Sequence, residues 1–206
     1  MTSFAAVFDR IPKPVLFAVA GLIQVALIAL MVADRIMILR TGTDVTLQTQ
    51  PVDPRDFLRG DYVTLGYGIS NVPGGGDDLK DSAHRRTDIF GRPVPGDVFV
   101  KLAPNPDGFY EAISVHAAPV DVTSPEVLIR GRVRGSIWCS DSRSYCRLNV
   151  RYGIESYFVP EGEGGKLEAA RNQRKLTVVA AVTPAGRAAI KRLLIDGEPV
   201  YDEPWL

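Results

Sequence analysis

The chain has 206 residues, of which 46% are hydrophobic, and 24 Lys and Arg balance 24 Asp and Glu to give a formal net charge of +0. The length suits one domain, and the hydrophobic content suffices for a packed core, which excludes a disordered chain. The balanced charge lacks the basic excess that nucleic-acid binding requires, so no nucleic-acid partner is expected.

The most distinctive segment is an apolar run from Val15 to Ala33, in which Gln24 is the single strongly polar residue. A helix of this length rises about 28 Å, close to the hydrocarbon thickness of a bilayer. A cleaved signal peptide is the main alternative, but it has a shorter apolar core and small residues before the cleavage site. Here the candidate cleavage site would follow Ala33, and Met31, two positions earlier, is not a small residue. We therefore predict an uncleaved transmembrane helix at residues 15–33.

Basic residues flank the apolar run on both sides, so the positive-inside rule does not set its orientation. The short N-terminal tail and the long C-terminal part favour a single-pass signal anchor, with residues 1–14 in the cytoplasm. Residues 34–43 are expected to end the helix and to link it to an extracytoplasmic domain at residues 44–206. This arrangement places the domain on the far side of the membrane from the cytoplasm.

Beyond the linker, much of the sequence alternates between apolar and polar residues, as β-strands do. Strands are expected at 45–50, 62–69, 97–103, 109–115, 127–134, 176–182, 190–195 and 198–201, short helices at 54–59 and 166–174, and a long loop at 71–86. The run at 176–182 is continuously apolar, which predicts a central strand. Asp196-Gly197 is a strong hairpin turn signal. The expected fold is mainly β, an antiparallel sheet or open β-barrel with one or two short helices.

Two cysteines, Cys139 and Cys146, flank a polar loop between two strand-like runs. A hairpin that places them opposite each other sorts both strands into one apolar and one polar face. In this register the two Cα atoms lie within disulfide range, and Arg134 faces Arg151. A disulfide indicates an oxidising compartment, in agreement with a domain outside the cytoplasm. Two unpaired thiols are the alternative.

The polar face of this hairpin is rich in arginine. Arg130, Arg132 and Arg134 alternate along the preceding strand. Arginines that face each other repel unless an anion lies between them, and Arg and Trp are enriched at protein interfaces. The predicted binding residues are Arg134, Arg147, Arg151 and Trp138. Their expected ligand is an acidic partner surface or a lipid headgroup; internal ion pairing on a solvated face is the alternative.

Residues 60–67 read Gly-Asp-Tyr-Val-Thr-Leu-Gly-Tyr and fit the pattern G-D-Y-x-x-L-x-Y at every specified position. These positions are Gly60, Asp61, Tyr62, Leu65 and Tyr67. The string resembles the bacterial GDYXXLXY family, and residues 53–56 and 152–162 also look like that family. The resemblance implies a membrane-associated bacterial protein that works with a multi-pass membrane protein. With the predicted topology, this places the anchor in the inner membrane and the β domain in the periplasm. It implies no established activity.

No complete catalytic or metal-binding set stands out, so no catalytic residue, cofactor or metal is expected. The layout of anchor, turn and Gly-Asp pair is similar to type I signal peptidases. Those enzymes use a serine nucleophile shortly before a Gly-Asp pair and a lysine general base, a role that Lys101 could imitate here. However, no serine lies between Thr49 and Gly60. The expected function is a non-enzymatic accessory or interaction domain. The alternative is a signal-peptidase-like fold with ligand-binding or hydrolytic activity that uses Asp61, Tyr62 and Tyr67 with Lys101.

Overall fold

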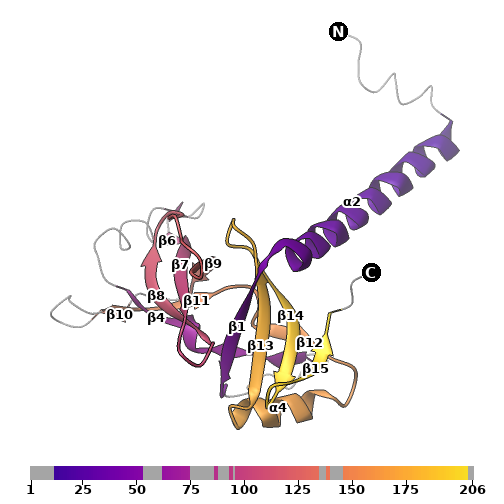
Figure 1. Ribbon diagram of the computed structural model, residues 1–206. Helices are drawn as coiled ribbons and strands as arrows, with labels where there is room; N and C mark the ends of the chain where they lie inside the picture. The colour runs from indigo at the N-terminus through magenta and orange to yellow at the C-terminus, as the bar shows by residue number, and fades with distance from the viewer. Residues whose placement is uncertain are drawn as a thin grey trace. The chain divides into compact units, whose positions relative to one another are not determined.

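The computed structural model describes residues 12–52, 62–74, 86–87, 93–94, 96–134, 138–139 and 146–203. The chain divides into two compact units, Met1–Met37 and Ile38–Leu206. In the first unit, helix α2 begins at Lys13, and it runs on to Thr41 without interruption (Figure 1). It is long and apolar enough to cross a membrane. The predicted apolar helix is therefore confirmed, and it ends at Thr41, within the segment 34–43 that was expected to end it.

The second unit contains two antiparallel sheets. The first sheet has the order β15-β14-β13-β1-β3 (Figure 1). Its strands are β1 (Thr43–Gln50), β3 (Gly66–Tyr67), β13 (Leu176–Val182), β14 (Ala188–Ile195) and β15 (Glu198–Asp202). The prediction that 176–182 is a central strand is confirmed. The β14–β15 turn has positive φ at Asp196 and Gly197, as a two-residue hairpin turn requires.

The second sheet has the order β10-β11-β9-β7-β8, and β4 also pairs with β11. Its strands are β4 (Asn71–Gly74), β7 (Asp97–Pro104), β8 (Tyr110–His116), β9 (Val127–Val133), β10 (Trp138–Cys139) and β11 (Cys146–Arg151). Strands β4 and β8 lie close together without being ladder partners, so this sheet nearly closes into a barrel. The predicted mainly β fold is confirmed.

Three smaller pieces complete the described chain. Two-residue strands β5 (Arg86–Thr87) and β6 (Pro93–Val94) pair with each other, and so do β2 (Tyr62–Thr64) and β12 (Ser156–Phe158). Helix α4 (Gly164–Asn172) lies at one end of the first sheet (Figure 1). It matches the helix predicted at 166–174, whereas the helix predicted at 54–59 lies outside the described residues.

The segment from Tyr62 to Gly74 joins the two sheets. Its β2 pairs with β12, its β3 with β1 and its β4 with β11. The single strand predicted at 62–69 is therefore wrong, because the segment changes partner twice and passes through a 3₁₀ turn at Gly68–Ser70. The loop predicted from residue 71 is also wrong at its start, since β4 is held by β11. Val63, Leu65, Tyr67 and Ile69 are nevertheless all buried, as the alternation of apolar residues along this segment predicts.

The cysteine hairpin has the predicted register only at its tip. Cys139 stands opposite Cys146, as expected, but Arg151 stands opposite Arg132. The predicted Arg134–Arg151 pair is therefore wrong: the backbone N–H of Arg134 donates to the carbonyl of Asn149 at 2.7 Å. The two registers differ by two residues. Because side chains alternate with period two, such a shift leaves the apolar and polar faces unchanged.

The predicted disulfide depends on side chains that the structure does not describe. The backbones of Cys139 and Cys146 are paired, while both side chains lie outside the described part of the chain. No disulfide joins residues whose side chains are described. The disulfide, and with it the oxidising compartment, stays a prediction.

Candidate functional site

Two buried tyrosines lock the motif segment to the chain that follows β11. The hydroxyl of Tyr67 donates to the carbonyl oxygen of Ile154 at 2.6 Å. The hydroxyl of Tyr152 donates to the carbonyl oxygen of Ile69 at 2.5 Å. The backbone N–H of Leu65 adds a bond to the carbonyl of Glu155 at 2.8 Å. The two segments thus exchange side-chain bonds in both directions, so Leu65 and Tyr67 of the motif act here as structural residues.

Burial keeps both tyrosines neutral. It raises the pKa of Tyr67 well above its ordinary value, and the nearby charge of Glu155 raises it further. The pKa of Tyr152 is raised by the same two causes in the same order. A hydroxyl that stays protonated and is already committed to a carbonyl is a poor acid–base group at neutral pH.

A third buried contact, which the sequence did not predict, comes from Arg171 on α4. Its side chain is 0% exposed, and it donates to the carbonyl oxygens of Thr64 at 2.6 Å and Val52 at 3.3 Å. Burial lowers the pKa of this guanidinium, and the charge of Glu168 opposes that shift. The helical period places Arg171 on the same buried face as Leu167. This position on the helix is the sequence feature that could have identified Arg171 as a buried residue.

The predicted arginines gather along one hollow of about 540 Å³, which we call the arginine groove. It runs over the polar faces of β9 and β11 and the loop that follows β11. Its four basic side chains are exposed, and two of them were predicted binding residues. They are Arg130, Arg132, Arg134 and Arg151. The two-residue shift in register thus changes the pairing but leaves all four arginines on one face.

The acidic residues of the groove are already engaged. Asp97 stands opposite Arg132 on the neighbouring strand and pairs with it at 3.4 Å. The carboxylate of Glu155 accepts the backbone N–H groups of Tyr152 at 2.5 Å and Gly153 at 3.0 Å. Four arginines face these two carboxylates, so the described residues of the lining carry a net charge of +2. A groove with this charge attracts anions.

Of the remaining predicted site residues, Tyr62 is described, and the other four lie wholly or with their side chains outside the described part of the chain. Arg147 and Trp138 are backbone partners at the tip of the hairpin, but their side chains lie outside the described part. Gly60 and Asp61 also lie outside it. Tyr62 is described, and its ring packs against the exposed ring of Phe158 at a centroid distance of 6.1 Å.

Lys101, which the signal-peptidase-like alternative uses together with the motif, forms an ion pair with a residue outside the motif. Its ammonium contacts the carboxylate of Glu126 at 2.6 Å, and this hydrogen bond lowers the pKa of Glu126. The hydroxyl of Tyr67 is bonded to a backbone carbonyl instead. Among the described residues, no group of three or more His, Cys, Asp and Glu side chains is placed to hold a metal ion.

Comparison with known proteins adds one finding. A search of curated proteins and a search of solved structures return no match. The family model described as "GDYXXLXY protein" matches residues 24–193, a range that includes the motif, both sheets except β15, and helix α4. Because this match covers most of the chain, the protein belongs to the GDYXXLXY family.

Proposed function

We propose that this protein is a membrane-anchored, non-enzymatic accessory subunit whose β domain binds an acidic surface of a multi-pass membrane partner. Helix α2 supplies the anchor, and the arginine groove supplies the contact. The N-terminus lies in the cytoplasm and the β domain in the periplasm. The proposal rests on one observation above all: exposed arginines line a groove whose carboxylates are already engaged.

The unpaired charge in the groove supports this proposal. Within the described residues, Arg130, Arg134 and Arg151 have no ion-pair partner. Arg132 pairs with Asp97, and Arg151 stands directly opposite it on the neighbouring strand. Like charges directly opposite each other on neighbouring strands destabilise a sheet. An acidic partner surface would relieve this repulsion, and arginine is the cation best suited to bind carboxylates at an interface.

The test reverses the charge of two groove residues, Arg134→Glu with Arg151→Glu. Full-length protein is cross-linked in its native membrane, extracted mildly and analysed for the proteins that accompany it. We expect a stoichiometric multi-pass partner with the unmodified protein and a strongly reduced yield with the double variant. The yield should also fall when the salt concentration is raised before cross-linking, because ionic contacts on a surface are screened.

The control makes the same charge change elsewhere, with Arg174→Glu and Lys175→Glu. Lys175 contacts Asp196 at 3.3 Å, but both side chains are exposed, so the loss of this pair should cost little stability. The control should retain the partner. Equal yields from groove variant and control, with both folded, would refute the role of the groove.

Anchoring and orientation have their own test. The full-length protein should stay with the membrane after an alkaline wash, and a chain without residues 1–37 should be released. Protease added to intact spheroplasts should digest the β domain. Protection of the domain in intact spheroplasts, with digestion only after lysis, would contradict the periplasmic location.

A further inference from the structure

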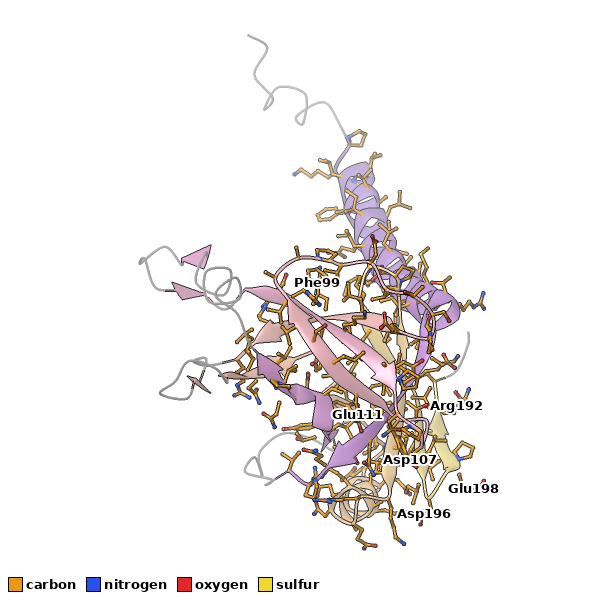
Figure 2. The ribbon with its side chains drawn as sticks, turned by 60° about the vertical axis from the view of Figure 1, so that its left-hand side comes forward. Phe99, Asp107, Glu111, Arg192, Asp196 and Glu198 are labelled. Atoms are coloured by element: carbon orange, nitrogen blue, oxygen red, sulfur yellow. The ribbon has the colours of Figure 1, made fainter. Side chains whose placement is uncertain are left out.

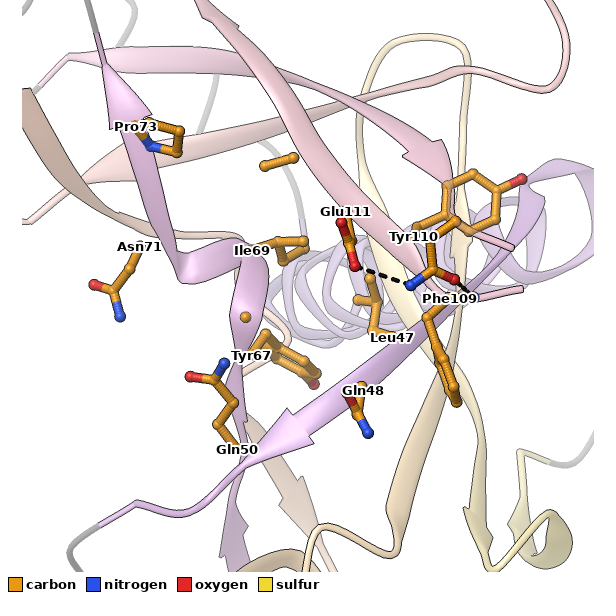
Figure 3. A pocket seen from close by; sticks show the side chains of 13 residues that line it. Leu47, Gln48, Gln50, Tyr67, Ile69, Asn71, Pro73, Phe109, Tyr110 and Glu111 are labelled. Atoms are coloured by element: carbon orange, nitrogen blue, oxygen red, sulfur yellow. Dashed lines mark hydrogen bonds between the residues drawn. The ribbon is translucent and has the colours of Figure 1, made fainter. Parts of the chain in front are cut away.

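A second hollow, of about 280 Å³, lies at the seam where the barrel-like sheet fails to close. We call it the seam cavity. Residues of β4 and the 3₁₀ turn line one side, residues of β8 line the other, and β1 runs beneath them (Figure 3). Its floor is formed by the buried side chains of Leu47, Tyr67 and Ile69. The motif residue Tyr67 thus supports a cavity as well as the joint between the sheets.

Uncommitted hydrogen-bonding groups surround this floor. Gln48 and Gln50 are exposed on β1, and their amides have no hydrogen-bond partner among the described residues. One carboxylate oxygen of Glu111 accepts from the side-chain amide of Asn105 at 2.9 Å, which leaves the other oxygen available (Figure 3). The carbonyl of that amide accepts the backbone N–H groups of Asp107 and Phe109, so Asn105 holds Glu111 in place.

The charge of the lining excludes anions as ligands. Among the described residues, no lysine or arginine lines the seam cavity, and Glu111 is the one carboxylate. Figure 2 shows Glu111 on the same hairpin as a second acidic residue, Asp107. This lining is opposite in charge to the arginine groove, and most of its polar side chains are uncharged amides, which suit a neutral ligand.

An extended peptide added as a strand fits the seam poorly. Pro73 interrupts the row of N–H groups along β4, and the pairing of β8 with β7 shifts register between Lys101 and Leu102. Proline and bulges are the features by which edge strands resist the addition of another strand.

We propose that the seam cavity binds a neutral saccharide. A sugar hydroxyl both donates and accepts, as the amides of Gln48 and Gln50 do, and the free oxygen of Glu111 accepts a further hydroxyl. The rings of Phe109 and Tyr110 belong to the same lining and offer apolar surface to the C–H face of a sugar ring. The volume lies near the lower end of the range for small-molecule sites, about 300–1,000 Å³, which suits one or two sugar rings.

The experiment uses full-length protein in lipid nanodiscs, because glycoside detergents would compete for the site. Maltotriose, cellotriose and chitotriose are titrated by calorimetry, and neutral triglycine serves as the peptide probe. We expect at least one trisaccharide to bind and triglycine not to bind. Gln48→Ala with Gln50→Ala should raise the Kd of that trisaccharide at least tenfold. Gln173→Ala, which removes an exposed amide at the end of α4, should leave it unchanged.

A second variant guards against loss of fold. Glu111→Gln preserves the size of the side chain and an acceptor for Asn105, and it should also weaken binding, since a charged acceptor is replaced by a neutral one. Each variant is checked by its unfolding midpoint. The proposal is wrong if no trisaccharide binds, if triglycine binds instead, or if folded Gln48→Ala/Gln50→Ala and Glu111→Gln variants bind as tightly as the unmodified protein.

Discussion

Replacing Tyr67 by phenylalanine removes one buried hydroxyl and leaves the ring in place. Tyr67 is 1% exposed, so the carbonyl oxygen of Ile154 would lose its 2.6 Å donor at a site that water does not reach. A buried acceptor left without a partner costs about 1–3 kcal/mol. We therefore expect Tyr67→Phe to lower the free energy of unfolding of the β domain by about 2 kcal/mol.

The assay is chemical unfolding in mild detergent, followed by near-ultraviolet circular dichroism, which reports the packing of tyrosines. Tyr110→Phe is the matched control, because the hydroxyl of Tyr110 makes an exposed 3.3 Å contact with the carbonyl of Pro125 and its loss should cost little. Tyr152→Phe removes the reciprocal bond and should resemble Tyr67→Phe. A change below about 0.5 kcal/mol for Tyr67→Phe would refute the structural role of this hydroxyl.

The pH dependence of stability provides a second readout of the same variant. The pKa values of Tyr67 and Tyr152 are both raised by burial, so both stay protonated in the folded domain above pH 10, where unfolded tyrosines ionise. The folded state then binds more protons, and stability must fall as pH rises above about 10. Each such group adds a slope of up to about 1.4 kcal/mol per pH unit. Tyr67→Phe should remove the contribution of Tyr67, while Tyr157, whose pKa is also raised, keeps its own.

Other variants test the remaining contacts by the same unfolding assay. Arg171→Met should destabilise by about 3 kcal/mol, because two partly buried carbonyls lose their donor. An effect near zero would contradict the role of these two bonds. Gly186→Ala should lower the free energy of unfolding more than Gly153→Ala does. Both glycines have φ near +80°, but only at Gly186 would the added Cβ come within 2.8 Å of a backbone atom. Equal losses of stability would contradict this packing. Cys139 and Cys146 should be unreactive to a thiol reagent until the unfolded protein is reduced, and reaction without reductant would exclude the disulfide.

Much of the fold was predictable because its signals are local. The strand at 176–182 has the predicted bounds, since a continuous apolar run needs no knowledge of its neighbours to be read as buried. The turn at Asp196-Gly197 is equally local, because both residues accept the positive φ that the turn requires. The two breaks in the strand predicted at 62–69 were not predictable, since they follow from partners in β12 and β11 that lie between 72 and 96 residues away along the chain.

The register of the arginine strands illustrates a limit of a different kind. Alternation of apolar and polar residues identifies a face but is unchanged when a strand slides by two residues. The sequence therefore placed Arg134 and Arg151 on the correct face and paired Arg134 with the wrong residue. It also could not reveal that Asp97 and Glu155 line the same groove, because these residues come from a different strand and from a loop.

The positions of the motif residues bear on how loss-of-function variants should be interpreted. Leu65 and Tyr67 are buried, and Tyr67 both joins the sheets and supports the seam cavity. A substitution at Tyr67 would thus disturb a ligand site and the stability of the domain together. Gln48 and Arg134 are exposed, so their substitution separates binding from folding. If the motif acts through structure, the loss of binding in Tyr67 variants should follow their loss of stability; a fully stable variant without function would instead point to chemistry at the motif.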